Sequence, residues 1–444
     1  MSSDNPFFHR GAIRQAEFFY GREAEINQIM GLLRNGQSVS LIGPRRIGKS
    51  SLLIHLMRPE VQDAHQWGAS QVLFVHLDCQ EFGESPADEV YEALYDALMD
   101  AAEAAGDVPL DVQPRERRST DTPGGYRAID RLLHQISRDG TAVVVLLDEF
   151  ELLAANAHLT PYFFARLRGL TTKYGLAYLT ASQRPLFNIT AEEEILSSPF
   201  FNIFVTLPLG LFTAEEARGL LNQRMLDRAY GFSPELINHL LFLVGPHPFF
   251  LHIAGYHAYQ AVTAVQLPLT DFAALDNAIE VEAASHLSYL WQNLAAEEQY
   301  TLAITNGPVD TVRLLEQQCL LHNNNGNYTY TSEILHRFVR RQDVSGLIQA
   351  GPFVIDQQRH QVSAENQEMA LTTSQFAILV CLCQNAGQVV HGDELETAVW
   401  GEVLVDDPDR LKTLIKRLRR AIVPYDNWIV SERGVGYALR PPEA

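Results

Sequence analysis

The segment that most constrains the fold is GPRRIGKS at residues 43–50, which lies between two apolar segments. Residues 38–42 (SVSLI) have the composition of a short buried strand, and residues 50–57 (SSLLIHLM) that of an apolar-faced helix. A glycine-rich loop at a helix N-terminus offers backbone N–H groups that curl around phosphate oxygens, and the helix dipole adds to the attraction. The spacing G-x-x-x-x-G-K-[ST] therefore predicts a phosphate cradle, because a chance match would not explain the strand before it and the helix after it.

The residue types in this loop indicate ATP or ADP with Mg²⁺ as the ligands. The ammonium of Lys49 would reach the β- and γ-phosphates, and the hydroxyl of Ser50 would take one coordination position of the metal. Further contacts are expected from the loop backbone and the first helical turn. The expected nucleotide-binding residues here are Gly43, Pro44, Arg45, Arg46, Ile47, Gly48, Lys49, Ser50 and Ser51.

A second segment supplies carboxylates. Residues 142–147 (AVVVLL) have the composition of a central parallel strand buried on both faces, and Asp148 and Glu149 follow directly. Asp148 would hold Mg²⁺ through water, and Glu149 would be the catalytic base that orients the attacking water. The alternative is a strand that simply ends in solvated acids, and the order of the two segments along the chain favours the nucleotide site.

Three further strand-like segments, at residues 71–77, 176–180 and 202–207, complete a predicted five-stranded parallel sheet. Ligands bind at the carboxyl edge of such a sheet. Arg184 follows the second of these segments and is therefore a candidate catalytic residue that senses the γ-phosphate. The alternative is a surface arginine before a turn proline.

Residues 18–25 (FFYGREAE) precede a helix with one apolar face and resemble the h-h-G-R-E-x-E signature of STAND-type P-loop ATPases, which are AAA+-related signal-transduction NTPases. LLDEFE at residues 146–151 resembles their Walker B motif, and GPHP at residues 245–248 resembles the G-x-P element of their helical lid. The resemblance spans roughly residues 15–345 and implies an α/β P-loop NTPase fold with a helical lid. The residues that it places near the adenine are Tyr20, Gly21, Arg22 and Pro248.

One departure from the related AAA+ ATPases concerns the arginine finger, which usually precedes the last core strand. Residues 191–203 contain neither Arg nor Lys, and the nearest candidates are Arg166 and Arg168. Because such a residue raises the rate by orders of magnitude, we expect a slow, regulatory ATPase.

After the core, Thr213 and Glu216 have the spacing of a capping box and predict a helix over residues 213–227 at the start of the lid. Residues 310–341 then indicate a helix that reaches Cys319, followed by two strands around an Asn-Gly turn. This order predicts a winged helix similar to the one that closes the STAND nucleotide module, where its usual role is to pack against bound ADP.

The C-terminal region predicts a second winged helix. Residues 351–370 alternate in short runs typical of a small sheet, two helices follow, and residues 427–439 indicate a hairpin. Before the hairpin, residues 410–422 predict a third helix that is amphipathic. Apolar residues form one stripe of this helix and five cations lie on its other faces, a pattern typical of a helix that contacts DNA. These cations are Lys412, Lys416, Arg417, Arg419 and Arg420.

This tail resembles the OmpR/PhoB-type winged helix of bacterial response regulators over about residues 350–441. The resemblance implies that Lys416, Arg417, Arg419 and Arg420 contact DNA phosphates or bases, and that Arg433 in the wing reaches the minor groove or the backbone. Against this, residues 351–444 hold nine Lys/Arg and thirteen Asp/Glu. The basic helix could therefore be solvated, or could dock on the acidic ATPase domain of the same chain.

The predicted domains are a P-loop core (1–210), a helical lid (211–280), a STAND-type winged helix (281–349) and an OmpR/PhoB-like winged helix (350–444). Residues 101–125 predict a flexible surface loop in the core. The 444 residues carry a formal net charge of −20, only four cysteines and no apolar signal segment, from which we expect a cytoplasmic protein without a membrane partner.

Together these features predict an ATP/ADP-dependent switch that controls binding of double-stranded DNA by the second winged helix, with self-association in the ATP state. Two alternatives remain. In the first, the chain is an adaptor ATPase of a bacterial defence system whose tail recruits a protein effector. In the second, it is a DNA-loading AAA+ ATPase, which the missing finger disfavours.

Overall fold

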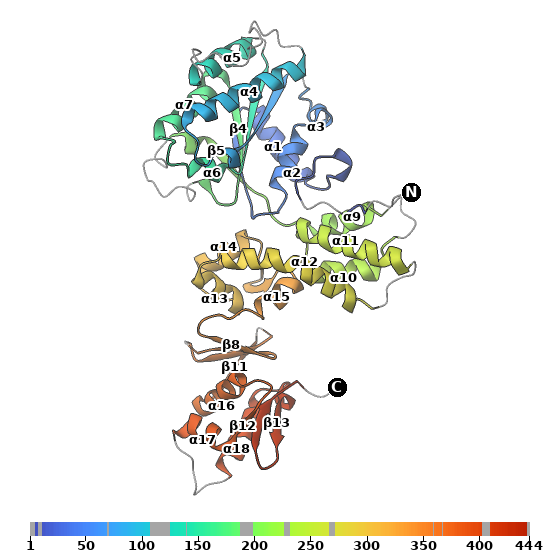
Figure 1. Ribbon diagram of the computed structural model, residues 1–444, viewed down its shortest axis with the longest axis vertical. Coiled ribbons are helices and arrows are strands. Elements are labelled where there is room, and N and C mark those ends of the chain that lie inside the picture. The colour runs from blue at the N-terminus through green and yellow to red at the C-terminus, as the bar shows by residue number, and fades with distance from the viewer. Residues whose placement is uncertain are drawn as a thin grey trace. The chain divides into compact units, whose positions relative to one another are not determined.

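The computed structural model describes residues 5–7, 11–68, 71–106, 125–138, 140–186, 199–225, 231–265, 271–357, 359–365, 367–401 and 409–441. The chain divides into two compact units, and Figure 1 labels many of their helices and strands. Unit 1 is Met1–Glu282 with Gln317–Cys319, and unit 2 is Ala283–Glu316 with Leu320–Ala444.

Unit 1 is built on a five-stranded parallel sheet, which confirms the predicted fold class. Neighbouring strands are parallel throughout, in the order β2-β3-β4-β1-β5. The strands are β1 (Ser38–Ile42), β2 (Val72–Asp78), β3 (Ala142–Asp148), β4 (Ala177–Ser182) and β5 (Phe204–Pro208). Because β1 lies between β4 and β5, the loop that follows β1 starts beside the ends of both neighbours.

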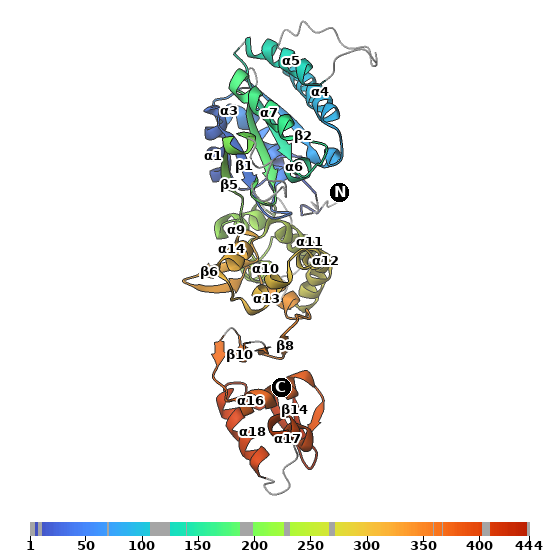
Figure 2. The ribbon, with the colours of Figure 1, turned by 90° about the vertical axis from the view of Figure 1, so that its left-hand side faces the viewer.

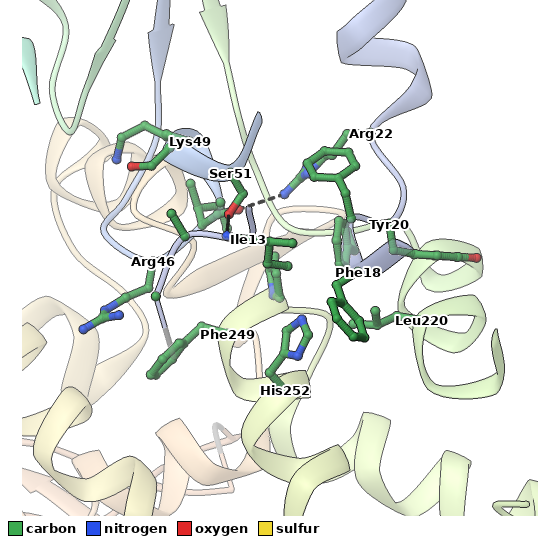
Figure 3. Close-up of a pocket in the computed structure, with 18 of the residues that line it drawn as sticks. Ile13, Phe18, Tyr20, Arg22, Arg46, Lys49, Ser51, Leu220, Phe249 and His252 are labelled. Carbon is green, nitrogen blue, oxygen red and sulfur yellow. Dashed lines mark hydrogen bonds between the residues drawn. The ribbon is translucent and has the colours of Figure 1, made fainter. Parts of the chain in front are cut away.

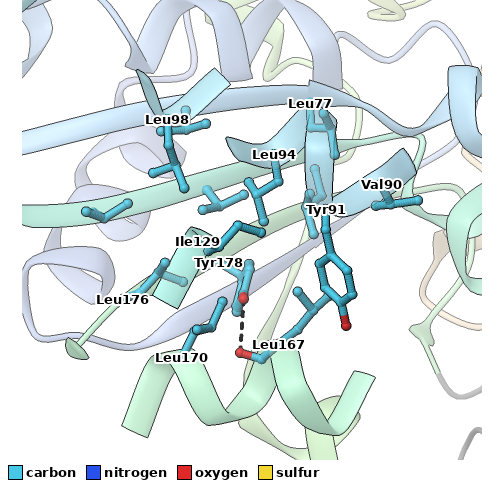
Figure 4. Close-up of a cluster of buried hydrophobic side chains, with 14 of the residues drawn as sticks. Leu77, Val90, Tyr91, Leu94, Leu98, Ile129, Leu167, Leu170, Leu176 and Tyr178 are labelled. Atoms are coloured by element: carbon cyan, nitrogen blue, oxygen red, sulfur yellow. Dashed lines mark hydrogen bonds between the residues drawn. The ribbon is translucent and has the colours of Figure 1, made fainter. Parts of the chain in front are cut away.

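Helices cover both faces of this sheet, so its central strands are apolar on both sides. Alternate residues of β3 show the two faces: Val145 packs in one core cluster and Val144 in the other. One face carries α1 (Glu23–Arg34) and α2 (Lys49–Leu56), with the short α3 (Pro59–Ala64) beside them (Figure 2). The other carries α4 (Ala87–Ala105), α5 (Tyr126–Arg138), α6 (Phe150–Ala154) and α7 (Pro161–Tyr174), whose cluster around Tyr178 is drawn in Figure 4.

Two details of the core differ from the prediction. The last strand begins two residues later than predicted, because Pro199–Ile203 forms a 3-10 helix whose Phe200 is fully buried. The predicted loop at 101–125 is wrong for its first five residues, which continue α4 to Ala105. This alanine-rich stretch favours a helix, and Gly106 ends it in the left-handed conformation. Residues 107–124 lie outside the described residues.

The lid of unit 1 comprises α9 (Ala214–Gln223), α10 (Pro234–Val244), α11 (Pro248–Val265) and the part of α12 (Ala273–Gln292) up to Glu282; the rest of α12 belongs to unit 2. The capping box at the start of α9 is confirmed, since Thr213 and Glu216 exchange both of its hydrogen bonds. The helix ends at Gln223, four residues before the predicted end. α12 continues through the predicted boundary at residue 280.

In unit 2, α13 (Ala296–Ile304), α14 (Val309–Gln317) and α15 (Glu333–Val339) accompany the hairpin of β6 (Leu321–Asn324) and β7 (Asn327–Tyr330). The predicted order of helix and hairpin is confirmed. The helix was predicted to reach Cys319, and this is wrong by two residues, because α14 ends at Gln317 and Cys319 has a positive φ of 59°.

The tail of unit 2 has the predicted sheet, three helices and hairpin. An antiparallel sheet of β8 (Leu347–Ala350), β9 (Phe353–Asp356), β10 (Gln361–Ala364) and β11 (Gln367–Met369) comes first. It is followed by α16 (Thr373–Gln384), β12 (Val389–His391), α17 (Gly392–Trp400), α18 (Arg410–Ala421), β13 (Ile429–Glu432) and β14 (Gly436–Leu439). Within the described residues, no helix combines the length and apolar composition needed to cross a membrane.

Candidate nucleotide site and nucleic-acid interface

The glycine-rich loop lies between the ends of β4 and β5. Its first residue, Gly43, donates its N–H to the carbonyl of Ser182 at 3.1 Å. A Cβ on Gly43 would lie 2.5 Å from the carbonyl oxygen of Leu209, so no larger residue fits without moving the backbone after β5. Gly48 has a φ of 105° directly before α2, which a glycine adopts without strain. The loop conformation therefore depends on glycine at both positions.

Lys49 begins α2 with its side chain turned into the loop. Its ammonium donates to the carbonyls of Gly43 at 2.8 Å and of Pro44 at 3.1 Å, and the residue is buried. Burial lowers the pKa of Lys49, while the carboxylates of Glu149, Glu151 and Asp148 act in the opposite direction. A cation held inside a loop of this shape fits the phosphates of a nucleotide.

The carboxylates come from the end of β3. Asp148 is buried, and its Oδ1 accepts the N–H of Glu149 at 3.0 Å. Glu149 has a φ of 49°, a conformation that few non-glycine residues adopt, and its side chain lines the pocket above the loop. The oxygens of Glu149 and Ser50, which line the same pocket, are of the type that Mg²⁺ prefers, and Asp148 directly precedes Glu149 outside that wall.

Glu151 is a carboxylate that the sequence interpretation missed. Its Oε1 accepts the N–H of Gln183 at 3.1 Å, which joins the segment after β3 to the segment after β4. Burial raises the pKa of Glu151, and the neighbouring charge of Glu149 adds to the effect. The sequence feature that could have indicated it is the position of Glu151, an acidic residue two positions after Glu149.

One pocket of unit 1 collects most of the predicted nucleotide contacts (Figure 3). Gly21, Gly43, Pro44, Asp148 and Arg184 are not in its wall. The predicted residues that line it are Tyr20, Arg22, Arg45, Arg46, Ile47, Gly48, Lys49, Ser50, Ser51, Glu149 and Pro248. Phe18 and Phe19, which begin the segment that the resemblance places near the adenine, also lie in the wall. The wall also contains residues that the sequence interpretation missed: Gly11, Ala12, Ile13, Phe212, Leu220, Phe249 and His252.

Arg22 holds the parts of this wall together. Its guanidinium donates to Glu25 at 2.9 Å, to the carbonyl of Gly210 at 2.6 Å and to that of Ile47 at 3.3 Å. It also lies over the ring of Phe212, with 4.6 Å from its central carbon to the ring centroid. The side chain is 4% exposed, so these contacts replace water almost completely. Arg22 thus joins the loop, the end of the sheet and the start of the lid.

A second arginine, Arg46 of the loop, contacts the lid. The guanidinium of Arg46 lies over the ring of Phe249, at 5.1 Å from the centroid, and Phe249 belongs to the first turn of α11. Arg46 itself has a positive φ of 67°. Loop and lid are therefore in contact on the side of the pocket where Pro248 also lies.

The arginines considered for catalysis lie elsewhere. Arg184 is exposed after β4, outside the pocket wall, and its carbonyl accepts the hydroxyl of Ser182 at 2.8 Å. Arg166 lies over the rings of Tyr126 and Tyr162, at 5.0 and 4.4 Å. These ring contacts of Arg166 are thus with tyrosines of α5 and α7, which lie on the same face of the sheet.

In unit 2, α18 presents the basic face that the sequence predicts. Leu411, Ile415 and Leu418 are buried in the core of the tail. The predicted DNA contacts that are exposed on the helix and the wing are Lys412, Lys416, Arg417, Arg420 and Arg433; Arg410, also exposed on α18, lies over the ring of Trp400 at 4.5 Å. Lys412 pairs with Asp409 at 2.9 Å, a pair that is largely exposed on both sides and therefore weak.

Arg419 has a different position from the other predicted DNA contacts. Its guanidinium donates to the carbonyl of Ile429 at 2.6 Å from Nη2, and to the hydroxyl of Ser431 at 2.9 Å. Both acceptors belong to β13, the first strand of the wing. Arg419 therefore ties the helix to the wing, and three of its donors are used within the protein.

Family models match both parts of the chain. Residues 27–308, more than half of the 444, match the model described as Novel STAND NTPase 2. Residues 366–439 match the model described as Transcriptional regulatory protein, C terminal.

Individual relatives agree with this division. The sensory transduction protein RegX3 of Mycolicibacterium smegmatis is 36% identical over 97 residues, which cover 21% of this chain and 42% of that protein. The response regulator ArlR of Staphylococcus saprophyticus is 29% identical over 108 residues, 24% of this chain and 49% of that protein. The chain thus spans less than half the length of these curated relatives.

Among solved structures, the Walker-type ATPase paby2304 of Pyrococcus abyssi superposes with a TM-score of 0.55 at 15% identity. The match covers 75% of this chain and 99% of that one. At this identity the similarity concerns the fold alone.

Proposed function

Because the chain belongs to the Novel STAND NTPase 2 family, we propose that it is an ATP-dependent switch whose output is DNA binding by its C-terminal winged helix. The proposal rests on one combination: an NTPase domain whose pocket is walled by core and lid together, and a transcriptional-regulator domain with an exposed basic helix. A ligand that contacts core and lid in one pocket can bias the arrangement of the two, which is the requirement for a switch.

At the pocket, the residues of the loop would bind the nucleotide and set up slow hydrolysis. Lys49 would exchange its two carbonyl acceptors for phosphate oxygens, and Ser50 and Asp148 would hold Mg²⁺. Glu149 would orient the attacking water. No arginine that the structure describes beyond the loop and Arg22 lines the pocket, so turnover should be slow unless a second copy of the chain supplies one.

At the DNA, Lys416, Arg417 and Arg420 would contact phosphates or base edges from the major groove, while Arg433 would reach the backbone or minor groove from the wing. Arg419 would hold the wing in place. Self-association in the ATP state would align several tails on neighbouring half-sites.

The test is fluorescence anisotropy with a labelled fragment from upstream of the chain's own coding sequence, in a slowly hydrolysed ATP analogue. The variant is Lys416→Ala/Arg420→Ala. The matched control is Arg313→Ala, which removes an exposed arginine of α14 outside the tail. Each lost phosphate contact should reduce the slope of log affinity against log salt by about 1, so the double variant should lose about 2.

An unchanged salt slope in the double variant would contradict DNA contact by α18. If the wild-type chain binds no DNA at any salt concentration, the output assigned here is wrong, and the adaptor interpretation, in which the tail binds a protein effector, replaces it.

A further inference from the structure

The first twenty-two residues contain a segment to which the function above gives no role, apart from the expected adenine contacts Tyr20, Gly21 and Arg22. Its described parts are residues 5–7 and 11–22, here called the N-terminal arm. The arm precedes α1 and contacts three elements of unit 1 that surround the pocket. Six of its residues line that pocket: Gly11, Ala12, Ile13, Phe18, Phe19 and Tyr20, apart from Arg22, which is described above.

The first anchor of the arm is Phe7, which is completely buried in the lid. Its ring lies against Gly255 of α11, where a Cβ would be 2.5 Å from the ring. The ring also stacks on Phe232, with centroids 5.8 Å apart, and meets the edge of His252 at 6.3 Å. Next to it, the side-chain amide of Asn5 donates to the carbonyl of Tyr256 at 2.9 Å. Gly255 thus provides a socket that only a residue without a side chain can form.

The second anchor holds the arm to the core. The N–H of Ile13 donates to the hydroxyl of Ser51 at 3.0 Å, in the first turn of α2. The guanidinium of Arg58, just after α2, donates to the carbonyl of Arg14. Figure 3 draws Ile13 and Ser51 in the wall of the same pocket as His252 of the lid.

A lid arginine contacts the arm at two positions, one before Gly11 and one at Phe18, which itself lines the pocket. Arg224, which follows α9, donates to the carbonyl of Pro6 at 3.3 Å and to that of Phe18, and it lies over the ring of Phe18 at 5.2 Å. Burial lowers the pKa of Arg224 to about 10, which leaves it charged at neutral pH. The described parts of the arm are therefore held to the lid at residues 5–7 and to the core at Ile13 and Arg14, and residues of the arm, the loop and the lid line the same pocket.

We propose that Phe7 is a positioning residue of the nucleotide site: seated against Gly255, it straps the lid to the core through the arm, so that nucleotide release requires Phe7 to leave its socket. This inference rests on the proposed nucleotide binding and adds the step that limits exchange. Phe7 does not line the pocket; it acts through the arm residues that do.

The experiment measures the dissociation rate of a fluorescent ADP from the full-length chain, chased with excess ADP in a stopped-flow instrument. Phe7→Ala empties the socket, and Gly255→Ala fills it from the other side. Each should raise the dissociation rate by about tenfold or more, since each removes or displaces an aromatic ring that is completely buried in the lid. The control is Phe242→Ala, which removes a lid phenylalanine that is 63% exposed and should change nothing.

The decisive comparison is the double variant Phe7→Ala/Gly255→Ala. If Gly255→Ala acts only by expelling Phe7, the double variant should release ADP no faster than Phe7→Ala alone. Phe7→Leu should restore part of the slow release. General damage to the lid would instead give additive effects and no such restoration.

A wild-type measurement covers the case in which Phe7→Ala fails to fold. Hydrogen exchange should show that the amide of Ile13 is better protected with ADP bound than without. Equal protection, additive effects in the double variant, or release within about twofold of wild type in the single variants would overturn the strap. A wild-type chain that binds no ADP would overturn the proposed function as well, so the two failures are distinguishable.

Discussion

Replacing Arg22 by alanine should destabilise unit 1 and open the wall of the nucleotide pocket. The substitution removes a guanidinium that donates to Glu25, to Ile47 and to Gly210, at a site that is 4% exposed. Glu25 lies nearer the surface and can be rehydrated. The two carbonyls lose a charged donor, at about 1–3 kcal/mol each, and the packing on Phe212 is lost in addition. We therefore expect a loss of about 3–5 kcal/mol.

The assay is hydrogen exchange of the β1 amides in the full-length chain, followed by mass spectrometry, because β1 is paired with a strand on each side in the sheet of unit 1. A loss of this size should make them exchange about two to four orders of magnitude faster. Arg22→Lys keeps the charge but cannot span three acceptors, so it should give an intermediate result.

The matched control is Arg34→Ala at the other end of α1. Arg34 is exposed and donates to the carbonyl of His65 at 2.8 Å, so its loss should cost less than about 1 kcal/mol. If Arg22→Ala also costs less than about 1 kcal/mol, the reasoning that Arg22 holds loop, sheet and lid together is wrong.

Three further predictions concern other parts of the molecule. Burial and the charge of Arg22 lower the pKa of His247 in the folded chain to about 3, so on acidification the imidazole is protonated in the unfolded chain at a higher pH than in the folded one. The free energy of unfolding should therefore fall by about 2 kcal/mol from about pH 7 to about pH 5. His247→Asn should reduce this pH dependence, as measured by urea titrations at several pH values. Arg419→Ala should loosen the wing and cost about 1–2 kcal/mol in thermal unfolding, whereas Lys416→Ala should leave stability unchanged and weaken only DNA binding. Gly43→Ala should abolish ADP binding in calorimetry, because its Cβ would displace the backbone at Leu209; retained affinity would show that the loop tolerates the shift.

The sequence predicted those features of the fold and the site that depend on neighbours along the chain. The loop before Lys49, the carboxylates after β3 and the capping box of α9 are local patterns with a direct physical cause, and each lies where it was expected. The predicted ends of strands and helices were less accurate. The 3-10 helix that contains the buried Phe200 delays the start of β5, and the alanine-rich end of α4 extends that helix into the predicted loop.

Features that depend on distant contacts could not be predicted. Phe7 and Gly255 are in contact although they are far apart in the sequence, so no local pattern connects them. Arg419 has the spacing of a DNA contact, and only the fold shows that β13 supplies its acceptors. Arg184 follows the expected strand, yet its side chain is exposed outside the pocket wall.

The most direct test of the account is the affinity of the full-length chain for its DNA in ADP and in a slowly hydrolysed ATP analogue, measured at one salt concentration. A switch requires a difference between the two nucleotide states, and we expect binding at least about tenfold tighter in the ATP analogue, a coupling of about 1.4 kcal/mol. Lys49→Ala should abolish that difference. Equal affinity in both nucleotides, or a difference that survives Lys49→Ala, would contradict the claim that the pocket controls the tail.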